Sequence, residues 1–222
     1  MRILCVADIH GHAEPLQQVL AFGKAQGCTV VLAAGDLCFP GPQPLETWKL
    51  LMGVRAHCVQ GVSDLAIATL DPDDLPTPDA EHEQRVQRLR DTQRELGEVI
   101  LARLERLPTT FRMTLEDGGE LLLVHGSPSD PTASITHDMS DDEVLAMLGD
   151  EAADLVVCGG GHVPFERFVE PTRIVSVGSV GESPTPNVAH AAILDTSSAG
   201  IQVRIVQLVL GGDGTGDPSE GP

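Results

Sequence analysis

RILCVADIHG, residues 2–11, begins as a short apolar run and ends in an acid, an imidazole and a glycine. In an extended chain, side chains two residues apart point to the same side, so Asp8 and His10 can reach one ion together. The pair is weak evidence by itself, because an Asp in this setting more often caps a turn. The stretch predicts a β-strand whose carboxyl end carries polar groups.

The same layout recurs along the chain. Further apolar runs bounded by glycine or aspartate lie at residues 29–33, 56–59, 120–124 and 154–158. Helical patterns separate the earlier runs: one has Pro15 in its first turn and stops at Gly27, a shorter one covers 45–52, and a long amphipathic one covers 83–107. This alternation predicts an α/β fold.

The second half of the chain is predicted to be mostly strand. Strand-like runs lie at 110–115, 120–124, 165–170, 173–177, 188–195 and 201–208, and Asp117-Gly118 marks a hairpin turn. We therefore expect two mixed β-sheets packed face to face and flanked by helices, in one domain over residues 1–210. The segment 211–222 has no apolar anchor and predicts a disordered tail.

The polar residues collect just past the predicted strands, where ligands bind in open α/β sheets. Gly35-Asp36 follows the second run, and Gly61 to Asp64 follows the third. His125 and His162 follow the runs at 120–124 and 154–158. A single histidine of this kind is usually an ordinary hydrogen-bonded one, but the joint pattern predicts a metal site. Its candidate ligands are Asp8, His10, Asp36, His125 and His162.

Composition narrows the function classes. The 222 residues include 14 basic and 33 acidic ones, a formal net charge of −19, which disfavours long nucleic acid and anionic membranes as partners. Five cysteines without a CxxC spacing indicate a reducing compartment. No run of 18 apolar residues is present. We expect a soluble cytoplasmic protein, whose oligomeric state the sequence leaves open.

The polar blocks that follow the predicted strands resemble those of the calcineurin-like metallophosphoesterase superfamily, and in particular its small bacterial and archaeal phosphodiesterase-like (YfcE-type) branch. The first blocks are Asp8-Ile9-His10 and Gly35-Asp36. Later blocks are His125-Gly126-Ser127-Pro128, His162-Val163-Pro164-Phe165 and the turn Gly178-Ser179-Val180-Gly181. The resemblance covers nearly all the chain except the tail. It implies a four-layer α/β/β/α sandwich with two metal ions bridged by one carboxylate.

The resemblance also assigns ligands. It implies a first metal held by Asp8, His10, Asp36 and His162, and a second held by Asp36, His125 and the residues at positions 62 and 160. Those two positions are Val62 and Gly160, which offer no side-chain ligand. Ser63 replaces an imidazole that the family often carries to protonate the leaving group. We expect a complete first site and a weak or empty second one.

The resulting hypothesis is a metal-dependent hydrolase of phosphoric esters, a phosphodiesterase or phosphatase acting on a small phosphorylated molecule. Carboxylates with imidazoles favour Mn²⁺, with Fe or Zn²⁺ as alternatives. The rival is a non-catalytic binding or scaffold protein that keeps the fold. Residues 127–140 are either a lid contributing Ser129 or His137, or an ordinary surface loop. Four residues are weaker candidates for replacement ligands, for which core packing or solvent exposure is the simpler interpretation: Cys58, Cys158, His12 and His57.

Overall fold

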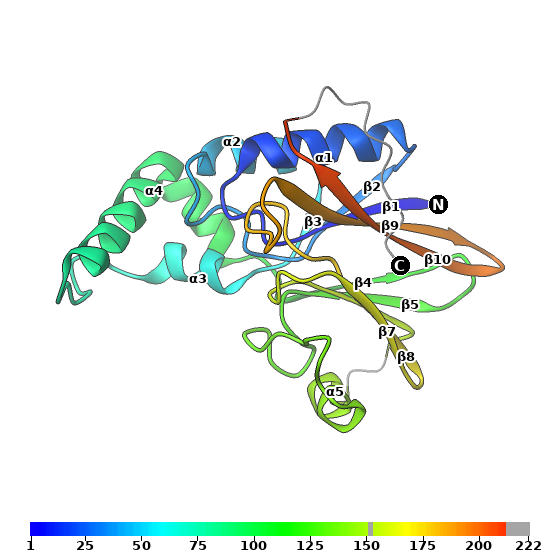
Figure 1. Ribbon diagram of the computed structural model, residues 1–222. Helices are drawn as coiled ribbons and strands as arrows, with labels where there is room; N and C mark the ends of the chain where they lie inside the picture. The colour runs from blue at the N-terminus through cyan, green and yellow to red at the C-terminus, as the bar shows by residue number, and fades with distance from the viewer. Residues whose placement is uncertain (151–152, 212–222) are drawn as a thin grey trace.

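Two five-stranded β-sheets lie face to face in the computed structural model, which describes residues 1–150 and 153–211 (Figure 1). In spatial order the first sheet contains β10 (Gly200–Val209), β9 (Val188–Ser197), β1 (Arg2–Val6), β2 (Val30–Ala33) and β3 (His57–Cys58). The second contains β4 (Thr110–Thr114), β5 (Glu120–Val124), β6 (Leu155–Cys158), β8 (Thr172–Ser176) and β7 (Phe165–Val169).

Both sheets are mixed, as expected. In the first, β1, β2 and β3 are parallel, while β9 runs antiparallel to β1 and β10. In the second, β5, β6 and β8 are parallel, and β4 and β7 are antiparallel edge strands. The Asp117-Gly118 turn joins β4 to β5, with Gly118 at φ 89°. Because the carboxyl ends of parallel strands share one edge, the loops after β1 and β2 are brought together in the first sheet, and the loops after β5 and β6 in the second.

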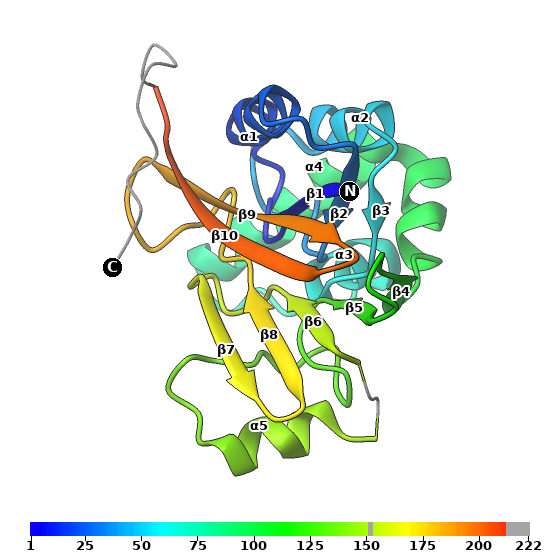
Figure 2. The ribbon, with the colours of Figure 1, turned by 90° about the vertical axis from the view of Figure 1, so that its right-hand side faces the viewer.

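Three apolar layers hold the two sheets and their helices together. In β1, Leu4 and Val6 face the outer helices, whereas Ile3 and Cys5 face the second sheet, as the two-residue strand period requires. The outer helices α1 (Ala13–Ala25), α2 (Pro44–Gly53) and α4 (Ala80–Glu105) cover the first sheet, and α5 (Asp141–Leu148) covers the second (Figure 2). The predicted four-layer sandwich is confirmed.

The helices depart from the sequence prediction in two places. The long helix starts at Ala80, because the Asp79 side chain accepts the His82 N–H at 2.9 Å, and Gly97 interrupts it at φ 72°, ψ 163°. The polar stretch 61–64, for which no helix was predicted, is the start of helix α3 (Val62–Thr69), in which the Asp64 carboxylate accepts the Gly61 N–H. No helix within 1–150 or 153–211 is long and apolar enough to cross a membrane. The tail predicted to be disordered is 211–222, of which 212–222 lie outside the described residues.

Candidate metal centre

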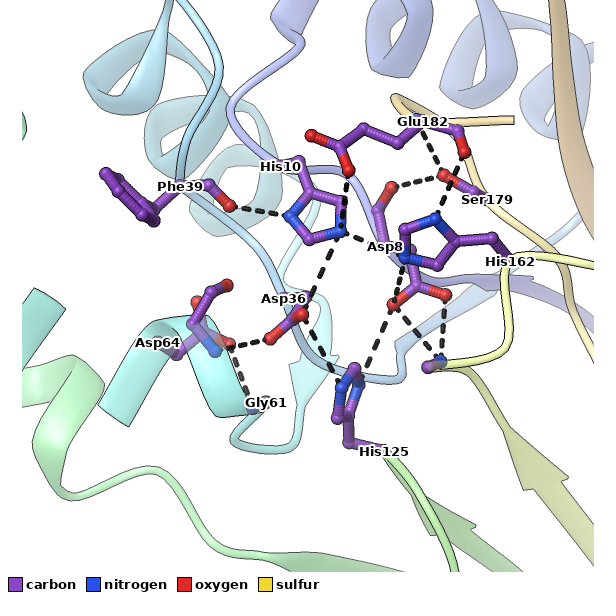
Figure 3. A network of polar contacts seen from close by, with 12 residues as sticks. Asp8, His10, Asp36, Phe39, Gly61, Asp64, His125, His162, Ser179 and Glu182 are labelled. Atoms are coloured by element: carbon purple, nitrogen blue, oxygen red, sulfur yellow. Dashed lines mark hydrogen bonds and ion pairs between the residues drawn. The ribbon is translucent and has the colours of Figure 1, made fainter. Parts of the chain in front are cut away.

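All five predicted ligands lie at one edge of the sandwich, each in the loop that follows a strand (Figure 3). Asp8 and His10 follow β1, Asp36 follows β2, His125 follows β5 and His162 follows β6. Backbone hydrogen bonds join the loops within each sheet: the His10 N–H donates to the Asp36 carbonyl at 2.8 Å, and the Gly159 N–H donates to the His125 carbonyl at 2.8 Å. Between the sheets, the Gly160 N–H donates to Asp8 Oδ2 at 2.9 Å. The loops therefore form one connected rim.

Four of these five residues have a left-handed backbone. Asp8, His10, Asp36 and His162 have φ between 50° and 57°, and among the described non-glycine residues only Arg55 and Asn187 share a positive φ. Such conformations are sparsely populated outside glycine and collect at functional sites, where the surrounding structure enforces them. The backbone thus marks the same residues that the sequence motifs selected.

The three histidines present the same nitrogen to the centre. Their Nδ1 atoms lie at hydrogen-bond distance from backbone carbonyls: His10 from Phe39 at 2.6 Å, His125 from Ala34 at 2.8 Å and His162 from Glu182 at 3.1 Å. A carbonyl only accepts, so each contact requires a proton on Nδ1 and leaves the Nε2 lone pair free. Holding a metal-binding imidazole by its other nitrogen is the usual arrangement in metal sites.

The ligand atoms form two groups that share Asp8. The first group is Asp8, His10 and His162, with 3.2 Å between the Nε2 atoms of His10 and His162. Two nitrogens that each lie about 2.1 Å from one ion at about 100° are about 3.2 Å apart, so this spacing suits a shared cation. The second group is Asp8, Asp36 and His125, with 3.6 Å between His125 Nε2 and Asp36 Oδ2.

Asp36 lies near both groups, since its Oδ2 is also 3.8 Å from His10 Nε2. The resemblance implied that Asp36 is the shared carboxylate, whereas in this geometry it is Asp8 that belongs to both groups. Asp8 and Asp36 each direct a carboxylate oxygen toward the region between the two ligand groups (Figure 3). The predicted ligand set itself stays a prediction.

The electrostatics favour a cation at this centre. Burial and the neighbouring Asp36 raise the pKa of Asp8 well above its ordinary value of 3.8, although the Gly160 N–H, 2.9 Å from Asp8 Oδ2, opposes the shift. Burial and His10 lower the pKa of His162, which favours its neutral, metal-binding form. A divalent ion would supply a positive partner for the two buried carboxylates.

Close backbone contacts explain the two glycines in the loops around Asp36. A Cβ at Gly61 would lie 2.1 Å from the Asp36 nitrogen, and a Cβ at Gly35 would lie 2.7 Å from His125 Nδ1. Only residues without a side chain let the loops approach this closely. The Ser63 N–H then reaches Asp36 Oδ1 at 2.8 Å and orients that carboxylate.

Sequence reasoning missed several supporting residues. Asp64, fully buried, accepts N–H groups from Leu37 at 2.9 Å and Gly61 at 3.0 Å, and so ties the loop after β2 to the start of α3. Glu182 places Oε2 3.7 Å from His10 Nε2. Ser179 donates its hydroxyl to the Asp8 carbonyl at 2.7 Å. Asp64 and Ser179 lie in stretches that the sequence singled out, 61–64 and 178–181, but their supporting roles were not predicted.

The two anomalous positions differ in what surrounds them. Val62 lies at the start of α3 with 46% of its surface exposed. Gly160 has φ 73°, and a Cβ there would lie 3.5 Å from His125 Nε2. A side chain at 160 would therefore begin close to the second group, and glycine leaves the group without a ligand from this position.

The weaker ligand candidates are outside both groups. Cys58 and Cys158 are buried in the apolar layers, and burial raises the pKa of each thiol to about 12. His57 is exposed and stacked on Phe111, with 4.6 Å between ring centroids. His12 lies against Gly41 and Gly181 and belongs to neither group. Packing accounts for these residues.

The sequence leaves residues 127–140 open as either a lid or an ordinary surface loop, and the two residues named for the lid, Ser129 and His137, lie away from the candidate ligands. The Ser129 N–H donates to the Met147 carbonyl at 3.0 Å, at the end of α5. His137 is exposed beside Phe165 of β7, with ring centroids 6.5 Å apart. These contacts hold both residues against the second sheet and its helix instead of the candidate ligands.

Comparisons with known proteins agree with the geometry. The calcineurin-like phosphoesterase superfamily domain matches residues 1–199. A search of curated proteins found no match. A hypothetical protein of Pyrococcus horikoshii OT3 has a similar structure, with 20% identity, coverage of 94% of this chain and 88% of that one, and a TM-score of 0.82.

Two further structures share the fold. Vps29 of Entamoeba histolytica, solved with Zn²⁺, has 20% identity, coverage of 96% and 95%, and a TM-score of 0.56. Yfce, a phosphoesterase from Escherichia coli, has 17% identity, coverage of 95% and 100%, and a TM-score of 0.52. The resemblance to the calcineurin-like phosphoesterase superfamily that the sequence motifs indicated is therefore confirmed, and the shared fold is consistent with its small branch.

Proposed function

Because the chain belongs to the calcineurin-like phosphoesterase superfamily, we propose that it is a metal-dependent hydrolase of phosphoric esters acting on a small phosphorylated molecule. One observation carries the proposal. Three Nε2 atoms with free lone pairs and two carboxylates face a common space at the strand ends. A protein without a metal would gain nothing from collecting these groups, whose mutual repulsion and burial destabilise the fold.

The metal ion and the protein would contribute different parts of the chemistry. A divalent ion at such a site polarises a phosphoryl oxygen and lowers the pKa of bound water. The first group would hold one ion, and the second group would contribute to a second. Gly160 and Ser63 use their backbone N–H groups to orient Asp8 and Asp36, so the carboxylates are positioned before any ligand arrives.

Metal identity follows from the donor atoms. Imidazoles with carboxylates suit Mn²⁺, Fe or Zn²⁺, and we propose Mn²⁺ because carboxylate oxygens belong to both groups. The cysteines near these loops are packed into apolar layers, so soft ligands are absent from both groups.

Substrate size follows from charge. With a net charge of −19, the protein repels a polyanion over most of its surface, whereas one or two phosphates can be neutralised by the ions themselves. We therefore propose a small phosphorylated molecule, such as a nucleotide or a phosphodiester metabolite.

The test combines metal content with turnover. Purified protein is analysed for metals, and hydrolysis of bis(p-nitrophenyl) phosphate and p-nitrophenyl phosphate is measured with added Mn²⁺. We expect bound metal and turnover, with the turnover abolished in Asp36→Ala. His57→Ala, which removes an exposed imidazole outside both groups, serves as the matched control for His125→Ala. Absence of turnover with Mn²⁺, Fe²⁺ and Zn²⁺ would refute the proposal.

A second candidate function is a binding or scaffold protein that retains the fold and one ion. The observation in its favour is the incomplete second group: Val62 is exposed and Gly160 carries no side chain. Vps29, solved with Zn²⁺, is among the structures with this fold. Stoichiometric metal without turnover on either ester would favour this candidate over the hydrolase.

A further inference from the structure

The position left without a ligand by Gly160 is filled from another loop. A Cβ added at Gly160 would lie only 2.4 Å from the hydroxyl oxygen of Ser134, and 3.5 Å from His125 Nε2. The Ser134 hydroxyl therefore occupies the space into which a side chain at 160 would project. A hydroxyl and an imidazole that both lie near the Cβ position of residue 160 can bind the same cation.

The loop that carries Ser134 is anchored at the neighbouring residue. Ile135 is fully buried in the apolar layer between the second sheet and α5, together with Leu122 and Val144. Its carbonyl oxygen lies 3.5 Å from a Cβ built at Gly161, so the loop packs against the Gly159–Gly161 turn. The anchor holds Ser134 at the rim of the metal centre.

The other end of the loop is held just as closely. A Cβ at Gly126 would lie 2.6 Å from the Pro131 carbonyl oxygen and 2.7 Å from that of Ala133. The Ser127 hydroxyl donates to the Asp130 carbonyl at 3.0 Å. The chain thus leaves His125, folds back over Gly126 and returns to the centre at Ser134. Its conformation fixes the hydroxyl relative to His125.

We infer that Ser134 Oγ is a ligand of the second group and takes the place of the missing side chain at position 160. Within the described residues, Ser134 Oγ has no hydrogen-bond partner that would compete for it. The second group then offers two carboxylates, one imidazole and one hydroxyl, against two imidazoles and one carboxylate in the first group.

This difference in donors predicts a difference in metal preference. Oxygen donors suit Mn²⁺ and Mg²⁺, whereas imidazoles suit Zn²⁺ and Fe. The first group should favour Zn²⁺ or Fe relative to the second, and the second should take Mn²⁺ or Mg²⁺. The inference deepens the proposed function by naming a residue and a metal class for the second ion, and it rests on that proposal only for the presence of a metal centre.

The test counts bound ions without using turnover. Metal-free protein is titrated with Mn²⁺, and free Mn²⁺ is followed by electron paramagnetic resonance. We expect two equivalents, of which the weaker loses affinity by about tenfold or more in Ser134→Ala while the tighter is unchanged. Ser129→Ala, in the same loop but against α5, is the matched control and should bind both equivalents as wild type does.

A substitution that changes the donor makes the test sharper. Ser134→Cys places a soft thiolate at the same point, so the weaker equivalent should shift its preference from Mn²⁺ to Cd²⁺ and show an ultraviolet thiolate-to-cadmium band. Ser134→Thr keeps the hydroxyl and should retain the weaker Mn²⁺ equivalent. Equal affinity of Ser134→Ala and wild type, or only one equivalent in wild type, overturns the inference.

The experiments distinguish failure of the Ser134 inference from failure of the hydrolase proposal. If two equivalents bind and the weaker depends on Ser134, but no ester is hydrolysed, the inference stands and the proposed activity falls. If esters are hydrolysed while Ser134→Ala binds Mn²⁺ as wild type does, the reverse holds.

Discussion

The buried carboxyl of Asp64 should make metal-free protein less stable as the pH rises. Asp64 is fully buried, and burial together with the neighbouring Asp36 raises its pKa from the ordinary value of 3.8 to about 7, against the opposing N–H bonds from Gly61 and Leu37. Between about pH 4 and pH 7, the folded protein keeps a proton on Asp64 that the unfolded chain has released. The free energy of unfolding therefore decreases through this window and levels off above it.

The size of the effect follows from the pKa. A rise of about three units corresponds to about 4 kcal/mol of lost stability once the pH is above 7. Asp64→Asn removes the titration, because its amide stays neutral at every pH. The variant keeps only one acceptor oxygen for two N–H donors, which costs about 1 kcal/mol at all pH values. The pH dependence of the difference in unfolding free energy between variant and wild type therefore reports on the titration of Asp64.

The assay is urea unfolding of both proteins in excess chelator at several pH values from 4 to 8. Groups that do not interact with Asp64 contribute equally to both proteins and cancel in the difference, whereas Asp8, whose pKa Asp64 raises, is a coupled contribution of the same sign. We expect the variant to gain stability relative to wild type as the pH rises from about 4 to 7, with no further gain above. A difference that stays constant or falls with pH would refute the reasoning. Saturating Mn²⁺ beside Asp36 should reduce the slope, because a cation favours the ionised carboxyl.

Three further predictions concern the loops around the centre. Gly61→Ala should lose bound metal and turnover, because its Cβ would meet the Asp36 nitrogen at 2.1 Å, whereas Gly53→Ala, with open space around it, should keep both in the same metal analysis. Ile135→Ala should lower the free energy of unfolding by about 3 kcal/mol in urea titrations and weaken the second Mn²⁺ equivalent, because it removes a buried anchor. Ser63→His should speed hydrolysis of alkyl phosphodiesters more than aryl ones, because only the poorer leaving group needs a proton donor; equal effects on both esters would contradict it.

The sequence predicted the parts of the fold that depend on side-chain pattern. In β1, the apolar run and the polar residues after it already carry the two-residue period and the strand end, so the strands and a pair of packed sheets could be inferred, whereas the assignment of each strand to a sheet came only from the structure. The kink in α4 could not, because Leu89, Leu96 and Leu104 keep a helical spacing on both sides of Gly97. The start of α3 was missed because its N-cap is Gly61, which has no side chain to reveal the cap.

The candidate site divides in a similar way. Its candidate ligands could be selected from the sequence because Asp and His are chemically distinctive and follow strands, and the structure brings them together. The carbonyls of Phe39 and Ala34 that orient His10 and His125 were not, because every residue has a carbonyl and only the fold selects which one is used. Ser134 was missed for a related reason: a serine in a loop carries no signal until the structure brings it beside Gly160.

These features bear differently on the two candidate functions. The left-handed backbones of Asp8, His10 and His162, each costing about 1 kcal/mol or more, and the buried carboxylates are offset if an ion binds the first group, whether or not the protein is a catalyst. The first group therefore cannot distinguish a hydrolase from a scaffold. The second group can, because the clamp on both the attacking and leaving oxygens of a phosphoryl transfer requires a second ion. If Ser134 completes that group, the change at position 160 is a relocation of the ligand instead of its loss, and the hydrolase becomes the better explanation of the whole rim.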